Sequence, residues 1–190
     1  FYATQRFTKI PDLMDGQEFY DFKMERAPDA MTPSELQVYQ SGEWVDWLDL
    51  ALRNGRSTQH NLSLSGGFRK TKYYLSGSLT DVTGLAVNDD YKRISSRINV
   101  DTDVKNWLTV GTRTQIAYSD ASGIAPSWSG SNGIFWFNPL TRAYDESGNL
   151  TIYPWPDDTF FRNPLQGLLA KDVDENYQVV SNNYAAVDFP

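Results

Sequence analysis

Three groups of neighbouring acidic residues are the first candidates for chemistry in this sequence. They are Asp157-Asp158, the pair Asp46 and Asp49, and the segment Asp172-Val173-Asp174-Glu175. Glycoside hydrolysis needs only two carboxyl groups beside the scissile bond, so composition alone does not exclude it. Clustered acids are also the ordinary content of solvated loops and helix faces. We favour the second interpretation for all three groups and predict no catalytic residue.

His60 is the only histidine, and the chain contains no cysteine. A Ser-His-Asp site would have to use His60, yet the sequence has no Gly-x-Ser-x-Gly nucleophile elbow. One histidine without cysteine also excludes a metal site built from His and Cys ligands. We therefore predict that the chain is not an enzyme, has no metal site and binds no cofactor.

Aromatic residues concentrate in residues 121–179 and are the candidate ligand-binding residues. The four predicted contacts are Trp128, Trp136, Tyr153 and Trp155. Sugar rings present C–H faces that pack on aromatic planes, and polar side chains nearby can bond their hydroxyl groups. The alternative is that so long a segment needs an aromatic core of its own to stay folded. Both interpretations stay open at the level of the sequence.

Charge and composition narrow the class of partner. The 190 residues include 17 Lys and Arg against 24 Asp and Glu, a net charge of -7 with no basic block, which predicts no nucleic-acid partner. No stretch approaches the ~20 consecutive apolar residues of a membrane-spanning helix. Aromatic residues make up 14% of this polar chain, a composition typical of β-rich proteins and ligand-binding surfaces.

Helical signals are confined to residues 8–56. Asp15-Gly16-Gln17-Glu18 opens one predicted helix. Thr32-Pro33-Ser34-Glu35 is a capping box with proline at the first helical position, so a second helix is predicted from Pro33. The spacing of apolar residues from Trp44 to Leu52 predicts a third, ending at Asn54-Gly55.

From residue 57 to residue 120 the apolar pattern has a period of two. In its clearest run Ile94, Ile98 and Val100 alternate with Arg93 and Arg97. Four such runs predict an antiparallel meander with one apolar and one polar face. Further extended pieces are predicted at residues 1–7 and 180–190.

The predicted connections are short at one end of this meander and long at the other. Short turns fall around residues 68–70 and 103–105, and the long connections are 8–56, 83–90 and 121–179. Outer-membrane barrels have this asymmetry. A soluble all-β carbohydrate-binding module with its loops at one end of a sandwich is the alternative. Five or six strands are fewer than the ~8 needed for closure, so a barrel interpretation implies an arc.

Residues 47–111 contain a series of motifs in a fixed order. They are Trp47-Leu-Asp49, Leu52-Arg-Asn-Gly55, Gln59-His-Asn-Leu-Ser-Leu-Ser-Gly-Gly67, Lys70-Thr-Lys-Tyr-Tyr-Leu-Ser76, Gly84, Tyr91-Lys-Arg93, Arg97-Ile-Asn-Val-Asp101 and Trp107-Leu-Thr-Val-Gly111. In order and spacing the series resembles the SusC/RagA-type TonB-dependent outer-membrane transporters, at the start of their barrel after the plug. Asn61-Leu-Ser-Leu-Ser-Gly-Gly67 and Lys70-Thr-Lys-Tyr-Tyr74 are its most specific part.

The resemblance implies an all-β fold: an antiparallel up-and-down meander forming an arc of a large outer-membrane β-barrel, with short helices in long loops. Residues 1–190 would be part of that barrel, divided into a helical long loop (8–56), a four-strand meander (57–120), a long aromatic loop (121–179) and a possible further strand (180–190).

The resemblance also implies a function and a set of partners. The expected function is that of a non-catalytic segment of an importer of glycans or peptides in the bacterial outer membrane. The expected partners are a SusD-like surface lipoprotein, the TonB complex through parts of the parent protein outside these residues, a glycan or peptide ligand, and outer-membrane lipid.

Overall fold

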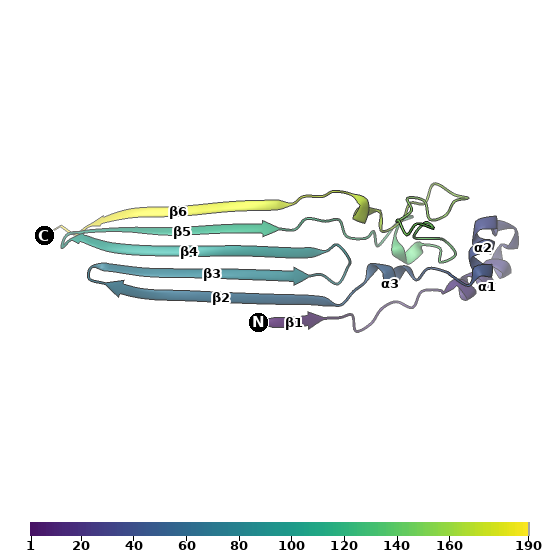
Figure 1. The fold of residues 1–190 in the computed structure, drawn as a ribbon, viewed down its shortest axis with the longest axis horizontal. Coiled ribbons are helices and arrows are strands. Elements are labelled where there is room, and N and C mark those ends of the chain that lie inside the picture. The colour runs from purple at the N-terminus through teal and green to yellow at the C-terminus, as the bar shows by residue number, and fades with distance from the viewer. Residues whose placement is uncertain (190) are drawn as a thin grey trace.

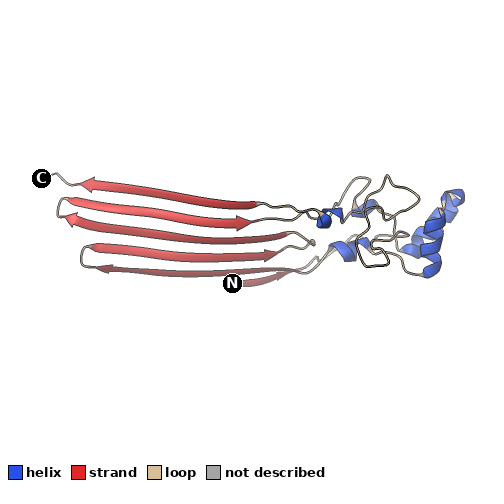
Figure 2. Ribbon diagram, turned by 45° about the horizontal axis from the view of Figure 1, so that its top comes forward, coloured by secondary structure: helices blue, strands red, loops and turns tan. Residues whose placement is uncertain are grey.

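The computed structural model describes residues 1–189 and is elongated, with a flat sheet at one end and helices and loops at the other (Figure 1; Figure 2). The strands are β1 (Tyr2–Gln5), β2 (Gly55–Phe68), β3 (Thr71–Thr83), β4 (Asp90–Lys105), β5 (Leu108–Asp120) and β6 (Glu175–Val187). The helices are α1 (Gly16–Arg26), η1 (Pro28–Ala30), α2 (Pro33–Ser41), α3 (Trp47–Ala51), η2 (Ile134–Trp136) and η3 (Gln166–Leu169). Among these described helices, none has the length and apolarity needed to span a membrane.

The six strands lie side by side in sequence order, and each neighbouring pair is antiparallel. Two-residue turns join β2 to β3 and β4 to β5, and Arg69 in the first of them has a φ of 55°, as tight hairpin turns require. The predicted up-and-down meander is therefore confirmed. Its last strand begins at Glu175, five residues before the range in which the sequence predicted one.

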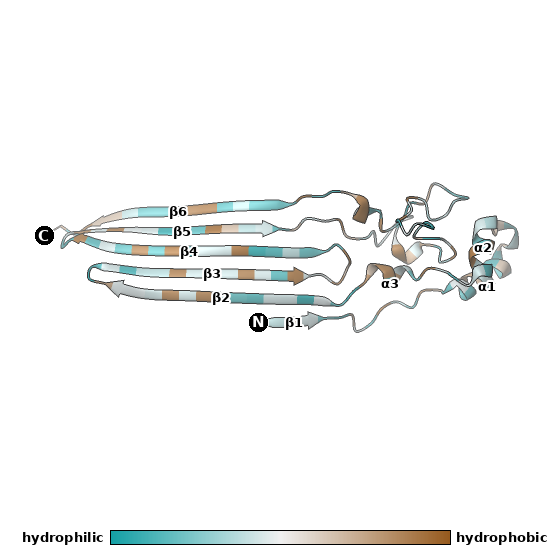
Figure 3. Cartoon of the chain, viewed as in Figure 1, coloured by the Kyte–Doolittle hydropathy of each residue, from teal (hydrophilic) through white to brown (hydrophobic). Residues whose placement is uncertain are grey.

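Strand register sorts the side chains onto two faces, because directly opposed residues in antiparallel strands point the same way. Leu64, Leu75 and Ile98 are successive partners on one face, whereas Arg97 and Gln115 are partners on the other. The alternation is visible as brown and teal bands along the strands (Figure 3). We call these the apolar face and the polar face of the sheet.

No element within residues 1–189 packs on the apolar face of β2–β6. Leu62 is 80% exposed there and Leu64 is 58% exposed. A β-sandwich buries this kind of face against a second sheet. The described residues form a single six-stranded sheet, so the sandwich of the alternative prediction is not what this chain builds.

The buried core lies at the other end of the molecule. We call residues 6–54 and 121–174 together the loop assembly, because they connect β1 to β2 and β5 to β6. Its core consists of Trp47, Leu48, Ala51, Ile134, Ala143 and Leu165. The Trp47 indole meets the edge of Phe137 at a centroid distance of 4.8 Å and donates a 3.1 Å hydrogen bond to the Asn138 carbonyl. Two segments about 90 residues apart in the chain thus fold around α3.

Capping sets the starts of the first two helices. Asp15 and Glu18 form a reciprocal capping box at α1, and Thr32 and Glu35 form one at α2. Each box satisfies backbone N–H groups that the first helical turn leaves without partners. Helix α2 ends at Ser41 and is capped by Gly42, whose φ of 72° is the left-handed conformation that glycine favours.

Helix α3 ends earlier than its apolar spacing predicts. It stops at Ala51, and Leu52 is already extended and bridges to Ala86. The Ala51 carbonyl accepts from the Val87 N–H, and Gly55 is the first residue of β2. The prediction of a helix through Leu52 with its cap at Asn54-Gly55 is wrong, because pairing with the β3–β4 connection overrides the local helical pattern.

Candidate functional site

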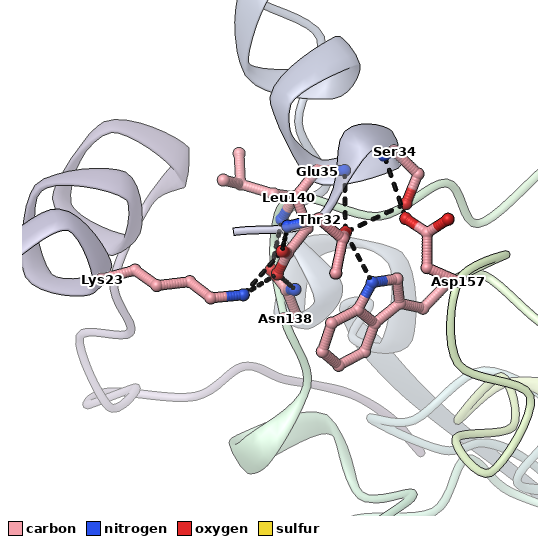
Figure 4. A network of polar contacts seen from close by, with 8 residues as sticks. Lys23, Thr32, Ser34, Glu35, Asn138, Leu140 and Asp157 are labelled. Carbon is pink, nitrogen blue, oxygen red and sulfur yellow. Dashed lines mark hydrogen bonds and ion pairs between the residues drawn. The ribbon is translucent and has the colours of Figure 1, made fainter. Parts of the chain in front are cut away.

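A network of polar contacts joins the two halves of the loop assembly (Figure 4). At its centre is Glu35, whose side chain is completely buried. Lys23 Nζ lies 2.6 Å from both of its carboxylate oxygens, the Thr32 N–H donates at 2.7 Å, and Asn138 Nδ2 donates from the second half. A buried carboxylate is tolerated only when it is paired and hydrogen-bonded in this way. The capping residue of α2 is thus also an attachment point for residues 121–174.

A second set of contacts reinforces this attachment. Asp157 Oδ2 accepts from the Ser34 N–H at 3.0 Å, and Trp155 Nε1 donates to Thr32 Oγ1 at 3.2 Å. The Lys23 ammonium lies 5.3 Å from the centroid of the Trp155 ring. Hydrogen bonding from Ser34 holds the pKa of the Asp157 carboxyl below its usual range. We call Lys23, Thr32, Ser34, Glu35, Asn138, Trp155 and Asp157 the interloop network.

The structure does not gather the four predicted ligand-binding aromatics at one place. Trp128 lines an apolar cavity of about 250 Å³ with Phe135, and none of the other three lines that cavity. Trp155 belongs to the interloop network. Trp136 is 78% exposed and Tyr153 is 40% exposed. Trp155 is committed to internal contacts and Trp128 packs against the buried core, so Trp136 and Tyr153 are the two predicted ligand contacts with exposed side chains.

Two acidic residues of the loop assembly accept hydrogen bonds from backbone N–H groups. Asp46 accepts from the Leu48 and Asp49 N–H groups at 3.0 Å and caps α3. The Asp145 carboxylate accepts hydrogen bonds from the Ser147 and Asn149 N–H groups. These bonds lower the pKa of Asp145, and the bond from Asn149 has the largest effect. Within residues 1–189 no group of three or more His, Asp or Glu residues is placed to hold a metal ion.

The polar face of the sheet holds a cluster that the sequence did not predict. Arg113 makes two 2.7 Å bonds to the Asp101 carboxylate, and Tyr184 donates its hydroxyl hydrogen to the same group. The Arg113 guanidinium lies 5.5 Å from the Tyr184 ring centroid. Gly111 leaves room for this arrangement, because a Cβ there would overlap both Tyr184 and Asp101. A glycine inside a strand pattern was the available signal, but its partner Tyr184 on β6 lies 73 residues later and is fixed only by the register of that strand.

An open, up-and-down antiparallel sheet with long connections at one end and tight turns at the other has the architecture of part of a large β-barrel. Solved structures support this class. The structure of the RagAB peptide transporter superposes with a TM-score of 0.68 and 20% identity, over 98% of this chain and 25% of that one. The RagAB peptide importer in its 'closed-closed' state gives a TM-score of 0.69 over the whole chain.

Sequence comparison gives relatives of one kind. TonB-dependent receptor P3 of Formosa agariphila is 28% identical over 99% of this chain and 19% of its own length. TonB-dependent receptor SusC of Bacteroides thetaiotaomicron is 27% identical over 47% of this chain and 8% of its own length. No family model matches the chain. The predicted resemblance is confirmed: the chain is similar to SusC-like TonB-dependent transporters, and it spans about a fifth of the length of its P3 relative.

Proposed function

We propose that the chain forms part of the barrel wall and two outer loops of a non-catalytic, TonB-dependent importer of glycans or peptides in the bacterial outer membrane. The observation that carries this proposal is the apolar face of β2–β6, which no element within residues 1–189 covers. Contact with the hydrocarbon chains of lipid would keep such a face away from water. The relatives are named as receptors and as a peptide transporter, which supports transport rather than catalysis.

The height of the apolar face fits a bilayer. At the long-loop end it is bounded by a row of opposed charged residues, Asp81, Lys92, Asp120 and Glu175. One row below, Tyr118 and Tyr177 pack with centroids 4.8 Å apart, as in an interfacial aromatic girdle. From Tyr118 to Leu108 the strand rises by about 34 Å, which a tilt of about 40° reduces to a height of about 26 Å. Outer-membrane barrels have an apolar band about 25 Å tall.

Polar residues interrupt this face at several positions, among them His60 and Ser96, and one polar patch lies between β5 and β6. It consists of Thr112, Thr114, Ser181 and Asn183. The Thr114 and Ser181 hydroxyls are 2.9 Å apart, and Asn183 donates to Ser181 at 3.2 Å. These bonds reduce the cost of placing hydroxyl and amide groups in a hydrocarbon environment. The patch is therefore compatible with lipid exposure.

The proposal includes a SusD-like surface lipoprotein seated on the loop assembly. Trp136 and Phe160 expose 78% and 71% of their surface there, and exposed aromatic residues are common anchors of protein interfaces. Contact with the TonB complex would involve parts of the parent protein outside this chain. The interloop network would hold the loop assembly in one shape for both the lipoprotein and the ligand.

Neighbouring residues on β3 provide the test. Leu75 lies on the apolar face and Ser76 on the polar face, and the chain has no cysteine of its own. Single Leu75→Cys and Ser76→Cys variants of the full-length protein in vesicles would be spin-labelled and exposed to oxygen and to a water-soluble nickel complex. We expect oxygen to relax the label at residue 75 more strongly and nickel the label at residue 76.

Equal accessibility of the two labels to nickel would refute membrane insertion of the sheet. A second measurement addresses the carbohydrate-binding-module alternative, because an autonomous module would be soluble without detergent. If residues 1–190 alone are monomeric and unfold cooperatively in detergent-free buffer, the alternative replaces the barrel arc as the account of the isolated chain.

A further inference from the structure

We propose that Asp101, Gly111, Arg113 and Tyr184 together fix the register of β6, that is, which of its residues pair with which residues of β5. We call these four residues the register cluster. All of their contacts lie among β4, β5 and β6. The role goes beyond transport, because it concerns how the strands of the sheet find their correct alignment.

Strand β6 lacks the two features that usually specify register. In a hairpin the turn fixes the register, as the two-residue turns do for β2–β3 and β4–β5, but β6 is reached through residues 121–174. Its alternation of apolar and polar residues is also weak. Val180 lies on the polar face, whereas Ser181 and Asn183 lie on the apolar face. Such a strand is prone to slip along its neighbour unless specific side-chain contacts prevent it.

The Tyr184 ring fits β5 at one position. Gly111 and Tyr184 are direct partners, and the ring lies over the glycine, where a Cβ would overlap it. Gly111 is the only glycine in β5. A slip of β6 by two residues would keep its side chains on the same faces but bring Tyr184 opposite Thr109 or Arg113. Both of these residues carry a side chain where the ring now lies, so only the observed register accommodates it.

Polar contacts select the same register. The Tyr184 hydroxyl donates a 2.5 Å hydrogen bond to Asp101 on β4, and Arg113 makes two 2.7 Å bonds to the same carboxylate. Such charge-assisted bonds are about twice as strong as neutral ones and depend closely on geometry. Asp101 and Arg113 both belong to the β4–β5 hairpin, whose short turn sets their alignment. The hairpin can therefore present this acceptor to β6 before β6 pairs.

Disulfide cross-linking of the full-length protein in isolated membranes reports the register, after any cysteines outside these 190 residues have been replaced. Gln115→Cys is combined in turn with Val180→Cys, its native partner, and with Gln178→Cys or Asn182→Cys, which a two-residue slip would bring opposite it. Direct partners have Cα atoms about 4.5–5.5 Å apart, within reach of a disulfide, whereas the diagonal positions are about 7–8 Å apart. We expect only the native pair to cross-link.

Three variants of these cysteine pairs assign the register to the cluster. Gly111→Ala places a methyl group where the ring lies and should lower the ratio of native to slipped cross-linking by about tenfold or more. Tyr184→Phe keeps the ring but loses the bond to Asp101, so it should lower the ratio less. Gly77→Ala, in β3, is the matched control, because within residues 1–189 its Cβ would meet no atom within 4 Å. It should leave the ratio unchanged.

An unchanged ratio in both Gly111→Ala and Tyr184→Phe overturns the proposal, because the register is then fixed elsewhere, as by the contacts of Glu175 at the loop end of β6. A change of equal size in Gly77→Ala overturns it as well. If Gly111→Ala does not accumulate in membranes, Tyr184→Phe decides alone. These outcomes are distinct from failure of the proposed function, since the spin labels at residues 75 and 76 report membrane insertion whatever the register of β6.

Discussion

The sheet and the loop assembly differ in where their side chains find partners. On the sheet, backbone ladders hold the strands together, and β6 is exposed along its whole length. In the loop assembly Ile134, Leu140 and Leu165 are completely buried. The loop assembly therefore has its own source of stability, whereas the sheet depends on what surrounds its faces.

The polar groups of the two regions differ in the same way. Those of the interloop network bond one another or the backbone, so they fix a shape. On the sheet, Asp101 and Arg113 pair with each other, whereas Arg97 bonds only the neutral Gln115 within residues 1–189. A mutation in the interloop network should thus act on the stability of the loop assembly.

The largest expected effect comes from removing the buried carboxylate of the interloop network. Glu35→Ala leaves the Lys23 ammonium, only 13% exposed, without its partner, and it removes the capping box of α2. We expect a loss of about 3–5 kcal/mol of local stability, the usual cost of breaking a buried ion pair. Hydrogen exchange should show faster exchange of α2 and of residues 121–174 and unchanged protection in β2–β5.

The control for this variant is Glu25→Ala, which removes an exposed carboxylate on α1 without a hydrogen-bonding partner among the described residues. It should leave exchange in both regions unchanged. If Glu35→Ala speeds exchange in the strands as much as in the loops, the two regions are one cooperative unit and the contrast between them fails.

Leucine truncations compare the two regions directly. Leu165→Ala in the core opens a cavity and should cost the loop assembly about 2–5 kcal/mol. Leu62→Ala on the apolar face leaves no enclosed cavity, so it loses only the transfer free energy of the deleted isopropyl group, about 1–2 kcal/mol. Urea unfolding of the full-length protein in vesicles, monitored by hydrogen exchange, would measure the stability losses of both variants. Equal losses at the two sites would mean that the Leu62 face is enclosed by protein.

Local patterns predicted the elements of both regions but not the contacts between distant ones. The period of two around Leu75 and Ser76 is a property of neighbouring residues, and so is the capping box of Thr32 and Glu35. That Glu35 also pairs with Lys23 and accepts from Asn138, 103 residues later, depends on how the loops pack. No short-range pattern specifies it.

The sequence also could not tell which of the candidate ligand-binding aromatic residues are exposed. Their concentration in one segment favours either ligand contact or an internal core, and the sequence treats all four candidates alike. The structure distinguishes them. Trp155 donates a hydrogen bond to Thr32 and lies beside the Lys23 ammonium, whereas Trp136 is exposed to solvent.

The smallest expected effect is a pH dependence within the loop assembly. The hydrogen bond from Ser34 lowers the pKa of Asp157 in the folded state, so its stabilising contribution is complete above the usual aspartate pKa of about 3.9 and is lost as the pH falls through the lowered value. Asp157→Asn removes this contribution. The difference in urea midpoint between the native protein and the variant, followed by tryptophan fluorescence, should therefore be larger at pH 7 than at pH 3. Asp29→Asn, exposed and without a side-chain hydrogen bond in the described chain, should show no such pH-dependent difference. A difference for Asp157→Asn that stays constant with pH would mean that the carboxylate's charge does not contribute to joining the two loops.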